Sequence, residues 1–480
     1  MKLLGYHQPM PRSLILLLVL LAFGLAGGVW LSRKNDSAAP TSGNAPGEIA
    51  LLQKQVEYLH DQVRALEKEN IRLADLLGKA RTGMVDAVAA SPPLPVEGDP
   101  DFNGIAIELL KTRGLQALPM NCMAADRSEV EGIIAKWLSE RFPKDYGSRQ
   151  GRALAALGAI PEAVDTLALR AAFWSHQIGA WYDEEQETLF LAPASDEGKE
   201  NALGLAFAQI FRENGARLFP KGRGVKNTDQ WLASMSLLAG DAAFTRLLHS
   251  LSHPKTGGGG GVSEDPDDPS HSMPLPNFLR ELELAPFGVG LDFVRGLHET
   301  AKFDQVDVVY SRPPMSCLEV LEPEVYLAEA QFKPDLPQWA DVNVNGLAPF
   351  WDDSLGAIPL VLLLKQQVPQ PVAAETAPGW RGDRLLVYPA EGKSRDHVAW
   401  QTLWKDGNAA DAFFSAMRQS LLGRNKGASS EKNAPAGVFK LDGPDRYVVL
   451  TRTHEGRGVF YADAADAAFA EALWKKLAGK

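Results

Sequence analysis

Residues 178–191, IGAWYDEEQETLFL, have the pattern of a β-hairpin. Apolar and aromatic residues at both ends flank a polar run, an order that favours strand, turn and strand. Helices are predicted at residues 129–142 before this hairpin and at residues 200–213 and 229–251 after it, because apolar residues recur there at helical spacing. The pattern predicts a mainly α-helical domain that covers residues 102–340 and contains one small hairpin.

Toward the C-terminus, residues 341–480 change to alternating strands and two helices. Each of these helices has an aspartate at its start, which is favourable at a helix N-terminus. Two strand–strand–helix sets look like weak copies of each other: 383–388, 397–404 and 411–422, then 445–450, 458–462 and 466–477. We therefore predict a small α+β module, with an internal duplication as a hypothesis, and an α+β fold class for the globular part.

An acidic, glycine-rich insertion at residues 255–272 interrupts the helical domain. Its composition is typical of a flexible loop. Asp265, Asp267 and Asp268 could contact calcium, but their spacing is not that of an EF-hand. We interpret the insertion as a solvated loop.

The N-terminal segment, residues 1–34, contains the uncharged run SLILLLVLLAFGLAGGVWL at residues 13–31. A helix of about 20 apolar residues crosses the hydrocarbon layer of a bilayer. The run predicts a single-pass transmembrane anchor in the inner (cytoplasmic) membrane, and its short N-terminal flank favours a periplasmic, extracytoplasmic location for the bulk of the chain. The alternative is a cleaved signal peptide, with Gly24 and Ala26 before the cut.

A polar linker, residues 35–47, leads into a seven-residue repeat at residues 48–81. Branched residues at the first core position and leucine at the fourth favour a parallel two-stranded coiled coil, and a lone core asparagine, Asn70, fixes its register. The repeat predicts a homodimeric stalk; the alternative is an amphipathic helix that packs on its own domain. A proline-rich linker at residues 82–101 ends the helix.

The composition restricts the class of protein and of partner. A chain of 480 residues with 45% hydrophobic and 23% charged residues is typical of a folded globular protein. The formal net charge of −11 argues against nucleic acid as the main partner, because phosphate binding needs clustered lysine and arginine. Cys122 and Cys317 could form one disulfide, but there is no framework of bridges.

Several segments of the globular part occur in the same order in a known family. They are Gly179-Ala-Trp-Tyr-Asp183, Asp229 with Leu237-Leu-Ala-Gly-Asp-Ala242, Pro313-Pro-Met-Ser316 with Pro323-Glu-Val-Tyr326, and Gly379-Trp-Arg-Gly-Asp-Arg-Leu-Leu-Val-Tyr388. In these segments the chain resembles an uncharacterised bacterial family of predicted zinc metallopeptidases, of the gluzincin type, that carry an HExxH motif. The resemblance implies a metallopeptidase-like fold and a cleft with an apolar floor.

The chain departs from this family at the metal site. Where the HExxH motif would fall, the sequence reads Leu205-Ala206-Phe207-Ala208-Gln209. In that motif two histidines bind zinc, and the glutamate acts as the general base. Leu205 and Ala206 have no donor atom, Gln209 offers only a neutral amide, and Ala239 stands where the third ligand, a glutamate, would lie. The resemblance therefore implies a degenerate member with no metal ligands, no catalytic residue and no cofactor.

We call Leu205, Ala206, Gln209 and Ala239 the vestigial positions. Without the resemblance, the first helix is an ordinary one with a buried face, and it carries no chemistry either. His249 and His253 have the i, i+4 spacing of a zinc helix but no glutamate base between them, so we interpret them as a solvated helix end. The remaining polar candidates are interpreted as structural or strand-end residues: His176, Arg381, Arg384 and Arg446.

The predicted function is a membrane-anchored, dimeric, extracytoplasmic pseudo-metallopeptidase that binds a protein or peptide partner without hydrolysis. One alternative is a structural or assembly adaptor of the cell envelope. An active hydrolase is a weaker alternative, because no nucleophile and base occur at a motif-like spacing. An open groove beside Gln209 and Ala239 would favour the pseudo-metallopeptidase, and a filled groove would favour the adaptor.

Overall fold

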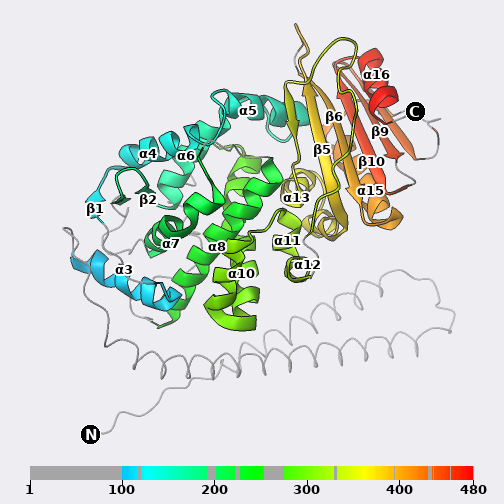
Figure 1. Cartoon of the computed structure of the whole chain (residues 1–480). Helices are drawn as coiled ribbons and strands as arrows, with labels where there is room; N and C mark the ends of the chain where they lie inside the picture. Colours follow the sequence, from blue (N-terminus) through cyan, green and yellow to red (C-terminus); the bar gives the residue numbers. More distant parts are fainter. Residues whose placement is uncertain are drawn as a thin grey trace, which may run out of the picture. The chain divides into compact units, whose positions relative to one another are not determined.

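The computed structural model describes residues 100–115, 121–191, 202–221, 227–252, 275–328, 332–393, 395–430, 435, 437–453 and 456–478. All of them belong to one compact unit, Pro92–Lys480. Figure 1 shows that helices make up most of this unit and that a β-sheet lies at its C-terminal end. The architecture of the described residues is α+β, as the sequence predicts.

The helical part contains α3 (Pro100–Arg113), α4 (Arg127–Ser139), α5 (Tyr146–Leu157), α6 (Thr166–Gln177), α7 (Ala202–Leu218), α8 (Thr228–Ser252), α10 (Asn277–Ser311), α11 (Cys317–Leu321) and α12 (Pro323–Leu327). Local sequence sets some of these bounds. The Asp126 side chain accepts the N–H of Glu129, and the Glu129 side chain accepts the N–H of Asp126, so a capping box starts α4. Gly158, in the left-handed conformation, ends α5.

The predicted hairpin is confirmed as β2 (Ala180–Asp183) and β3 (Thr188–Leu191), which pair antiparallel. The Asp183 side chain accepts the backbone N–H groups of Glu185 and Gln186, which stabilises the turn. β1 (Asn121–Ala124) adds a strand parallel to β3. The Trp181 ring lies 5.2 Å from the ring of Trp137 in α4 and 5.1 Å from that of Phe211 in α7, so aromatic contacts fix the hairpin to the helices.

The two longest described helices, α8 and α10, cross at a pair of glycines. A Cβ atom on Gly240 would lie 2.1 Å from the carbonyl carbon of Gly290. A Cβ atom on Gly290 would lie 2.0 Å from the carbonyl oxygen of Ser236. Backbone therefore meets backbone at this crossing, and any side chain larger than hydrogen would separate the helices.

The C-terminal part is one antiparallel sheet in the order β4-β5-β6-β10-β9-β8-β7. Its strands are β4 (Trp351–Asp353), β5 (Trp380–Tyr388), β6 (His397–Trp404), β7 (Ser429–Ser430), β8 (Val438–Gly443), β9 (Arg446–Thr453) and β10 (Gly458–Ala464). The helices of this part are α13 (Ala357–Lys365), α14 (Gln370–Ala374), the 3-10 helix η2 (Ala377–Gly379), α15 (Gly407–Arg424) and α16 (Ala467–Leu477). The strands and helices predicted from residue 383 onward are confirmed within a few residues.

Neighbouring residues along the strands face different hydrophobic cores. Leu385 shares the larger core with Phe413 of α15, and this core continues into the helical part. Leu386 shares a smaller core with Leu473 of α16. The two helices therefore cover opposite faces of the sheet. If residues 383–422 and 445–477 were rigid copies of each other, the rotation that superimposes β5 and β6 on β9 and β10 would place α15 and α16 on the same face of the sheet. They lie on opposite faces, so the two stretches are not copies of one rigid unit.

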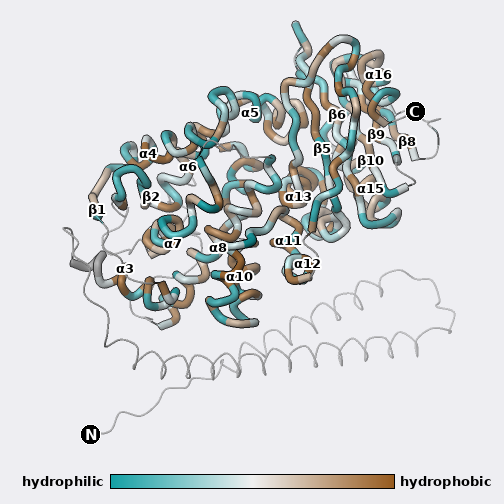
Figure 2. The backbone as a smooth tube through the Cα atoms, viewed as in Figure 1, coloured by the Kyte–Doolittle hydropathy of each residue, from teal (hydrophilic) through white to brown (hydrophobic). Residues whose placement is uncertain are grey.

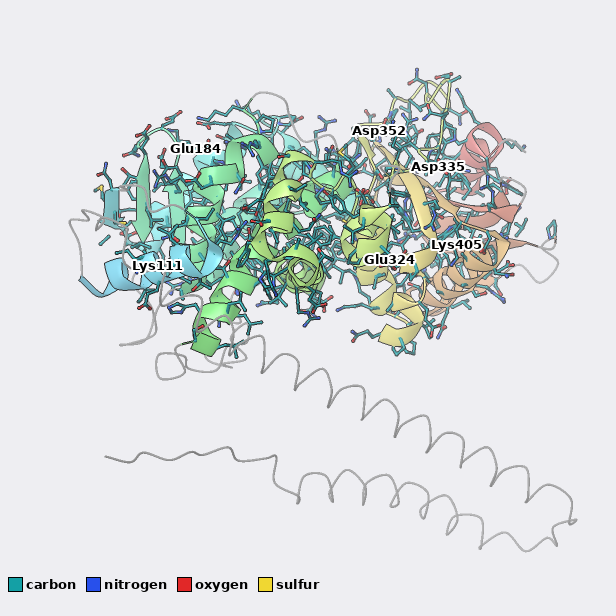
Figure 3. The ribbon with its side chains drawn as sticks, turned by 60° about the horizontal axis from the view of Figure 1, so that its bottom comes forward. Lys111, Glu184, Glu324, Asp335, Asp352 and Lys405 are labelled. Atoms are coloured by element: carbon teal, nitrogen blue, oxygen red, sulfur yellow. The ribbon has the colours of Figure 1, made fainter. Side chains whose placement is uncertain are left out.

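Hydropathy and charge separate between the inside and the outside of the unit. Figure 2 shows hydrophobic residues along α13, which contacts both α10 and α15. Exposed charged side chains lie on several elements around the unit, and Figure 3 labels Lys111 on α3, Glu324 on α12 and Lys405 after β6 among them. Cys122 and Cys317 are both free thiols.

The predicted transmembrane helix and the predicted inner-membrane, periplasmic location are corrected here. Among the described residues, no helix is both long enough and apolar enough to cross a bilayer. The strongly apolar α13 has 9 residues, which at about 1.5 Å per residue is less than half of the ~30 Å required. The run on which both predictions depended, residues 13–31, lies outside the described residues, as do the first linker and the coiled coil at residues 48–81. Of the proline-rich linker predicted at residues 82–101, residues 100 and 101 are described, and they belong to α3.

Candidate functional site

The vestigial positions lie inside the helical part and do not line an open groove. Leu205 and Ala206 are 1% exposed, Gln209 is 4% exposed, and Ala239 is 0% exposed. α3 packs against both α7 and α8. The Gln209 side chain donates a hydrogen bond from Nε2 to the carbonyl oxygen of Ala106 in α3, over 3.2 Å. The vestigial positions are therefore covered by α3.

A buried ion pair holds α3 in this place. Arg113 Nε lies 2.7 Å from Oδ1 and 2.9 Å from Oδ2 of Asp241 in α8. Nη2 of the same guanidinium lies 2.6 Å from Asp307 Oδ1 in α10, and the Tyr310 hydroxyl donates to Asp241 Oδ2 over 3.0 Å. Both Arg113 and Asp241 are buried. Breaking a buried pair leaves a charge without compensation, so this contact resists any movement of α3 away from α8.

The structure tests the other residues that were considered as metal ligands only in part. In the described part of the chain, no group of three or more His, Cys, Asp or Glu residues is arranged to hold a metal ion. The prediction of a solvated helix end at His249 is wrong, because its side chain is 3% exposed and its Nε2 lies 3.3 Å from Glu108 Oε2 in α3. His253 and the three aspartates of the insertion lie outside the described residues.

A cluster of buried carboxyl groups joins the helical part to the sheet. Asp229 at the start of α8 accepts the backbone N–H of Cys317 over 2.8 Å. Asp353 of β4 accepts the backbone N–H and the hydroxyl of Thr228, over 2.8 and 2.6 Å. Asp383 of β5 accepts the Ser354 hydroxyl over 2.7 Å and the indole N–H of Trp400 over 3.0 Å. These bonds connect α8 to α11 and to β4. They also connect β5 to β6, through Trp400, and to Ser354, which follows β4.

Burial changes the acidity of all three groups. It raises the pKa of Asp229 and of Asp353 to about 7 and that of Asp383 to about 6, and the charge of Asp383 contributes to the first two shifts. Perturbed carboxyls occur at functional sites, but structural networks produce them as well. Here backbone and side-chain donors of the fold occupy the carboxyl oxygens, which makes the cluster a junction between elements. Asp353 was not identified in the sequence analysis; the signal that could have indicated it is the acidic pair Asp352-Asp353, four residues before the apolar α13 begins.

This junction predicts a pH dependence of stability. A raised pKa means that the folded state binds the proton more tightly than the unfolded chain, so the stabilisation is complete at low pH and is lost as pH rises through about 6 to 7. Between about pH 6.5 and about pH 8 we expect the free energy of unfolding to fall by about 1–2 kcal/mol. Urea denaturation at the two pH values measures it.

The control for this prediction is Asp353→Asn, which keeps the shape of the side chain and cannot titrate. The variant is expected to lose a measurable part of the pH dependence. The chosen range also avoids His298, because burial lowers its pKa to about 4 and it stays neutral throughout. An unfolding free energy that is constant or rises across this range in the wild type would contradict the prediction.

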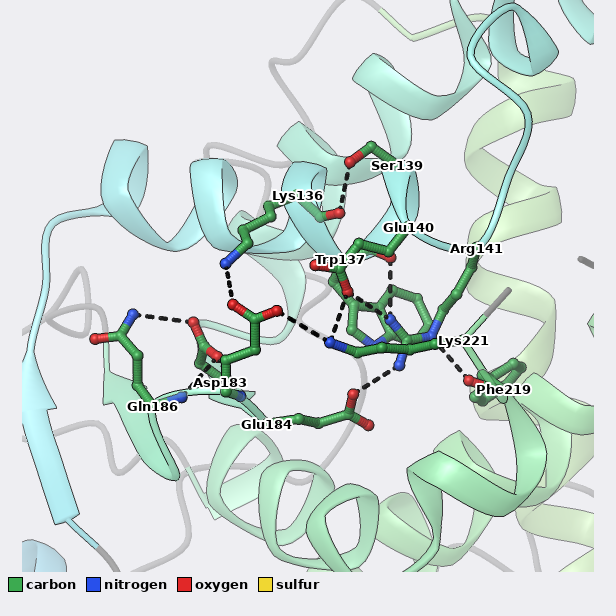
Figure 4. Close-up of polar contacts among 11 residues, drawn as sticks. Lys136, Trp137, Ser139, Glu140, Arg141, Asp183, Glu184, Gln186, Phe219 and Lys221 are labelled. Atoms are coloured by element: carbon green, nitrogen blue, oxygen red, sulfur yellow. Dashed lines mark hydrogen bonds and ion pairs between the residues drawn. The ribbon is translucent and has the colours of Figure 1, made fainter. Parts of the chain in front are cut away.

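A second polar cluster lies beside the hairpin (Figure 4). Glu185 contacts Lys136 over 2.6 Å and Lys221 over 3.2 Å, and Arg141 contacts Glu184 over 2.7 Å. The cavity among these side chains has a volume of about 20 Å³, which is room for about one water molecule. The charged groups of the cluster pair with one another, so it stabilises the hairpin turn and offers no room for a substrate.

The comparisons with known proteins match only the C-terminal part. Residues 349–474, from the strand β4 into α16, match a family described as Domain of unknown function (DUF8575). No curated protein matches the chain, and no solved structure matches it. The matched residues contain Asp353 and Asp383 of the junction and none of the vestigial positions. The seven-stranded sheet with its helices is thus the part of this chain that is similar to a known family.

Proposed function

We propose that the described part of this chain is a non-hydrolytic adaptor, which binds protein partners on its surface and not in a peptidase cleft. The observation that carries the proposal is the cover over the vestigial positions. α3 packs on α7 and α8, and Gln209 bonds to the Ala106 carbonyl. A peptide would reach these positions only after α3 had moved, and the buried contact between Arg113 and Asp241 opposes that movement.

The same cover argues against the two alternatives. A pseudo-metallopeptidase that binds a peptide at the vestigial positions needs an open groove beside Gln209 and Ala239. The side chains of both residues are buried. A hydrolase needs a nucleophile, a base and room for a substrate in one place. Neither the covered helices nor the small cavity beside the hairpin offers that combination.

Metal content and proteolysis test the absence of hydrolysis. The full-length protein is incubated with zinc, desalted, analysed for bound metal, and assayed on a mixture of unstructured peptides with and without a chelator. We expect no stoichiometric zinc and no cleavage that the chelator prevents. Stoichiometric zinc together with chelator-sensitive cleavage would overturn the proposal.

Hydrogen exchange tests the cover itself. We expect the backbone amides of α3 to exchange about as slowly as those of α8, because a buried ion pair joins the two helices. Fast exchange confined to α3 would show a cover that opens, and it would favour the peptide-binding alternative over the adaptor.

The proposed relationship to the HExxH family has a separate test. The variant Leu205→His, Ala206→Glu, Gln209→His, Ala239→Glu is expected to bind zinc, because it restores two histidines four residues apart, the base and the third ligand. Since Ala206 and Ala239 are buried, its folding is expected to depend on zinc, so circular dichroism is recorded with and without metal.

The matched control keeps both histidines and carries Ala206→Gln and Ala239→Gln. It has similar bulk at the buried positions but lacks the carboxylate ligand, so its zinc affinity is expected to be much lower. Equal zinc uptake by the two variants, or no uptake by a folded quadruple variant, would count against the relationship.

A further inference from the structure

A large cavity lies where five segments of the described unit meet. It is formed by the residues after α5, the residues after α13, Arg395 in the loop before β6, the end of α15 with the residues that follow it, and the turn between β8 and β9. Its volume is about 850 Å³, which is within the range of small-molecule sites and far above that of a single bound ion. The helical part and the sheet both contribute walls.

Positive charge predominates in this cavity. Arg395, Arg424, Lys426 and Arg446 line it, and Asp445 is the one acidic residue among its lining residues. Arg446 forms an ion pair with the buried Asp463, so its charge is compensated. The remaining lining residues carry three positive charges against one negative charge.

Arg424 is the most informative of these residues. Its Nη1 donates to the carbonyl oxygens of Leu157 and Gly158 at the end of α5, over 2.9 and 3.4 Å. Its Nε and Nη2, and the Nε of Arg446, are buried and have no hydrogen-bond partner among the described residues. Burial lowers the pKa of the Arg424 guanidinium, and the neighbouring charge of Arg395 acts in the same direction.

The helix ends explain only part of this arrangement. Carbonyl groups at the C-terminus of a helix attract cations, which accounts for Nη1 of Arg424 at the end of α5. They do not account for the two remaining nitrogens of that side chain or for a second arginine, Arg395, beside it. Buried polar groups are almost always satisfied, and like charges at close range are unfavourable unless an opposite charge lies between them.

We propose that this cavity binds a small polyanion that carries at least two phosphate or carboxylate groups. The planar fork of an arginine matches either group with two parallel hydrogen bonds, Lys426 adds a point charge, and the Gln367 amide in the wall adds a neutral donor. The ligand compensates the exposed charges of Arg395 and Lys426 and connects the helical part to the sheet. This inference does not depend on the adaptor function.

Calorimetry on the full-length protein tests the proposal with sodium pyrophosphate and sodium citrate as probes. Sodium chloride at equal ionic strength is the reference. We expect saturable binding of at least one probe with a dissociation constant of about 1 mM or lower, and a rise in the thermal unfolding midpoint that chloride does not produce. Tighter binding of pyrophosphate assigns the natural anionic groups as phosphates, and tighter binding of citrate assigns them as carboxylates.

Two exposed positions make the test specific. Arg395→Gln and Lys426→Gln remove charges that no ion pair in the described residues compensates, and together they are expected to weaken binding at least about tenfold. Lys111→Gln is the matched control, because Lys111 is an exposed lysine on α3 and does not line the cavity. Its dissociation constant is expected to equal that of the wild type.

Two results would overturn the proposal. One is the absence of saturable binding of either probe up to about 10 mM. The other is binding that the double variant leaves unchanged. Arg424→Gln adds a further comparison: it removes the third positive charge of the lining but also the contact with the end of α5, so its affinity is interpreted only after circular dichroism has shown that it folds.

Discussion

Gly240→Ala is expected to lower the free energy of unfolding by about 3 kcal/mol, the upper part of the range for overpacked cores. The new methyl group would lie 2.1 Å from the carbonyl carbon and 2.2 Å from the carbonyl oxygen of Gly290. Both are backbone atoms, so no rotation of a side chain relieves the clash, and α8 and α10 have to separate. Urea denaturation of the full-length protein measures the loss.

The matched control is Gly288→Ala on α10, two residues from the contact. A Cβ atom there meets nothing within 4 Å, and alanine is the better helix former by about 1 kcal/mol. This variant is expected to be neutral or slightly more stable than the wild type. If the two alanine variants have equal stability, the close crossing of α8 and α10 is wrong.

Arg113→Met is expected to cost about 3–5 kcal/mol, the usual effect of removing one member of a buried ion pair. Asp241 is 0% exposed, so it would keep a buried carboxylate with only the Tyr310 hydroxyl and a weak contact from Thr245 as donors. We expect lower stability by urea denaturation and faster hydrogen exchange in α3, because this contact fastens α3 to α8.

Two further variants identify the buried pair as the cause. Asp307→Asn removes the other partner of Arg113, whose side chain is 54% exposed, and is expected to cost about 1 kcal/mol or less. The double variant Arg113→Met, Asp241→Leu removes both buried charges and is expected to recover most of the lost stability. Equal losses for Arg113→Met and Asp307→Asn would contradict the assignment.

Local patterns were sufficient for much of the secondary structure. The hairpin and the strand His397–Trp404 fall where residue type and turn chemistry place them, because those signals act between neighbours in the chain. The pairing of β1 with β3 had no such signal. β1 has 4 residues and joins its partner in parallel across α4, α5 and α6, so its pairing depends on tertiary packing.

The sequence by itself determined that Leu205, Ala206 and Ala239 cannot bind zinc, because their side chains have no donor atom in any conformation. The tertiary structure alone decided that these positions are covered. The hydrogen bond of Gln209 to Ala106 spans 103 residues, and the contact of Arg113 with Asp241 spans 128.

The same reason applies to the junction carboxyls and to the cationic cavity. Burial by segments that are distant in the sequence raises the pKa of a carboxyl group or leaves a guanidinium nitrogen without a hydrogen-bond partner. The residue pattern within one segment does not show which distant segments will bury it. The absence of donor atoms could therefore be predicted from the sequence, whereas the properties that depend on burial could not.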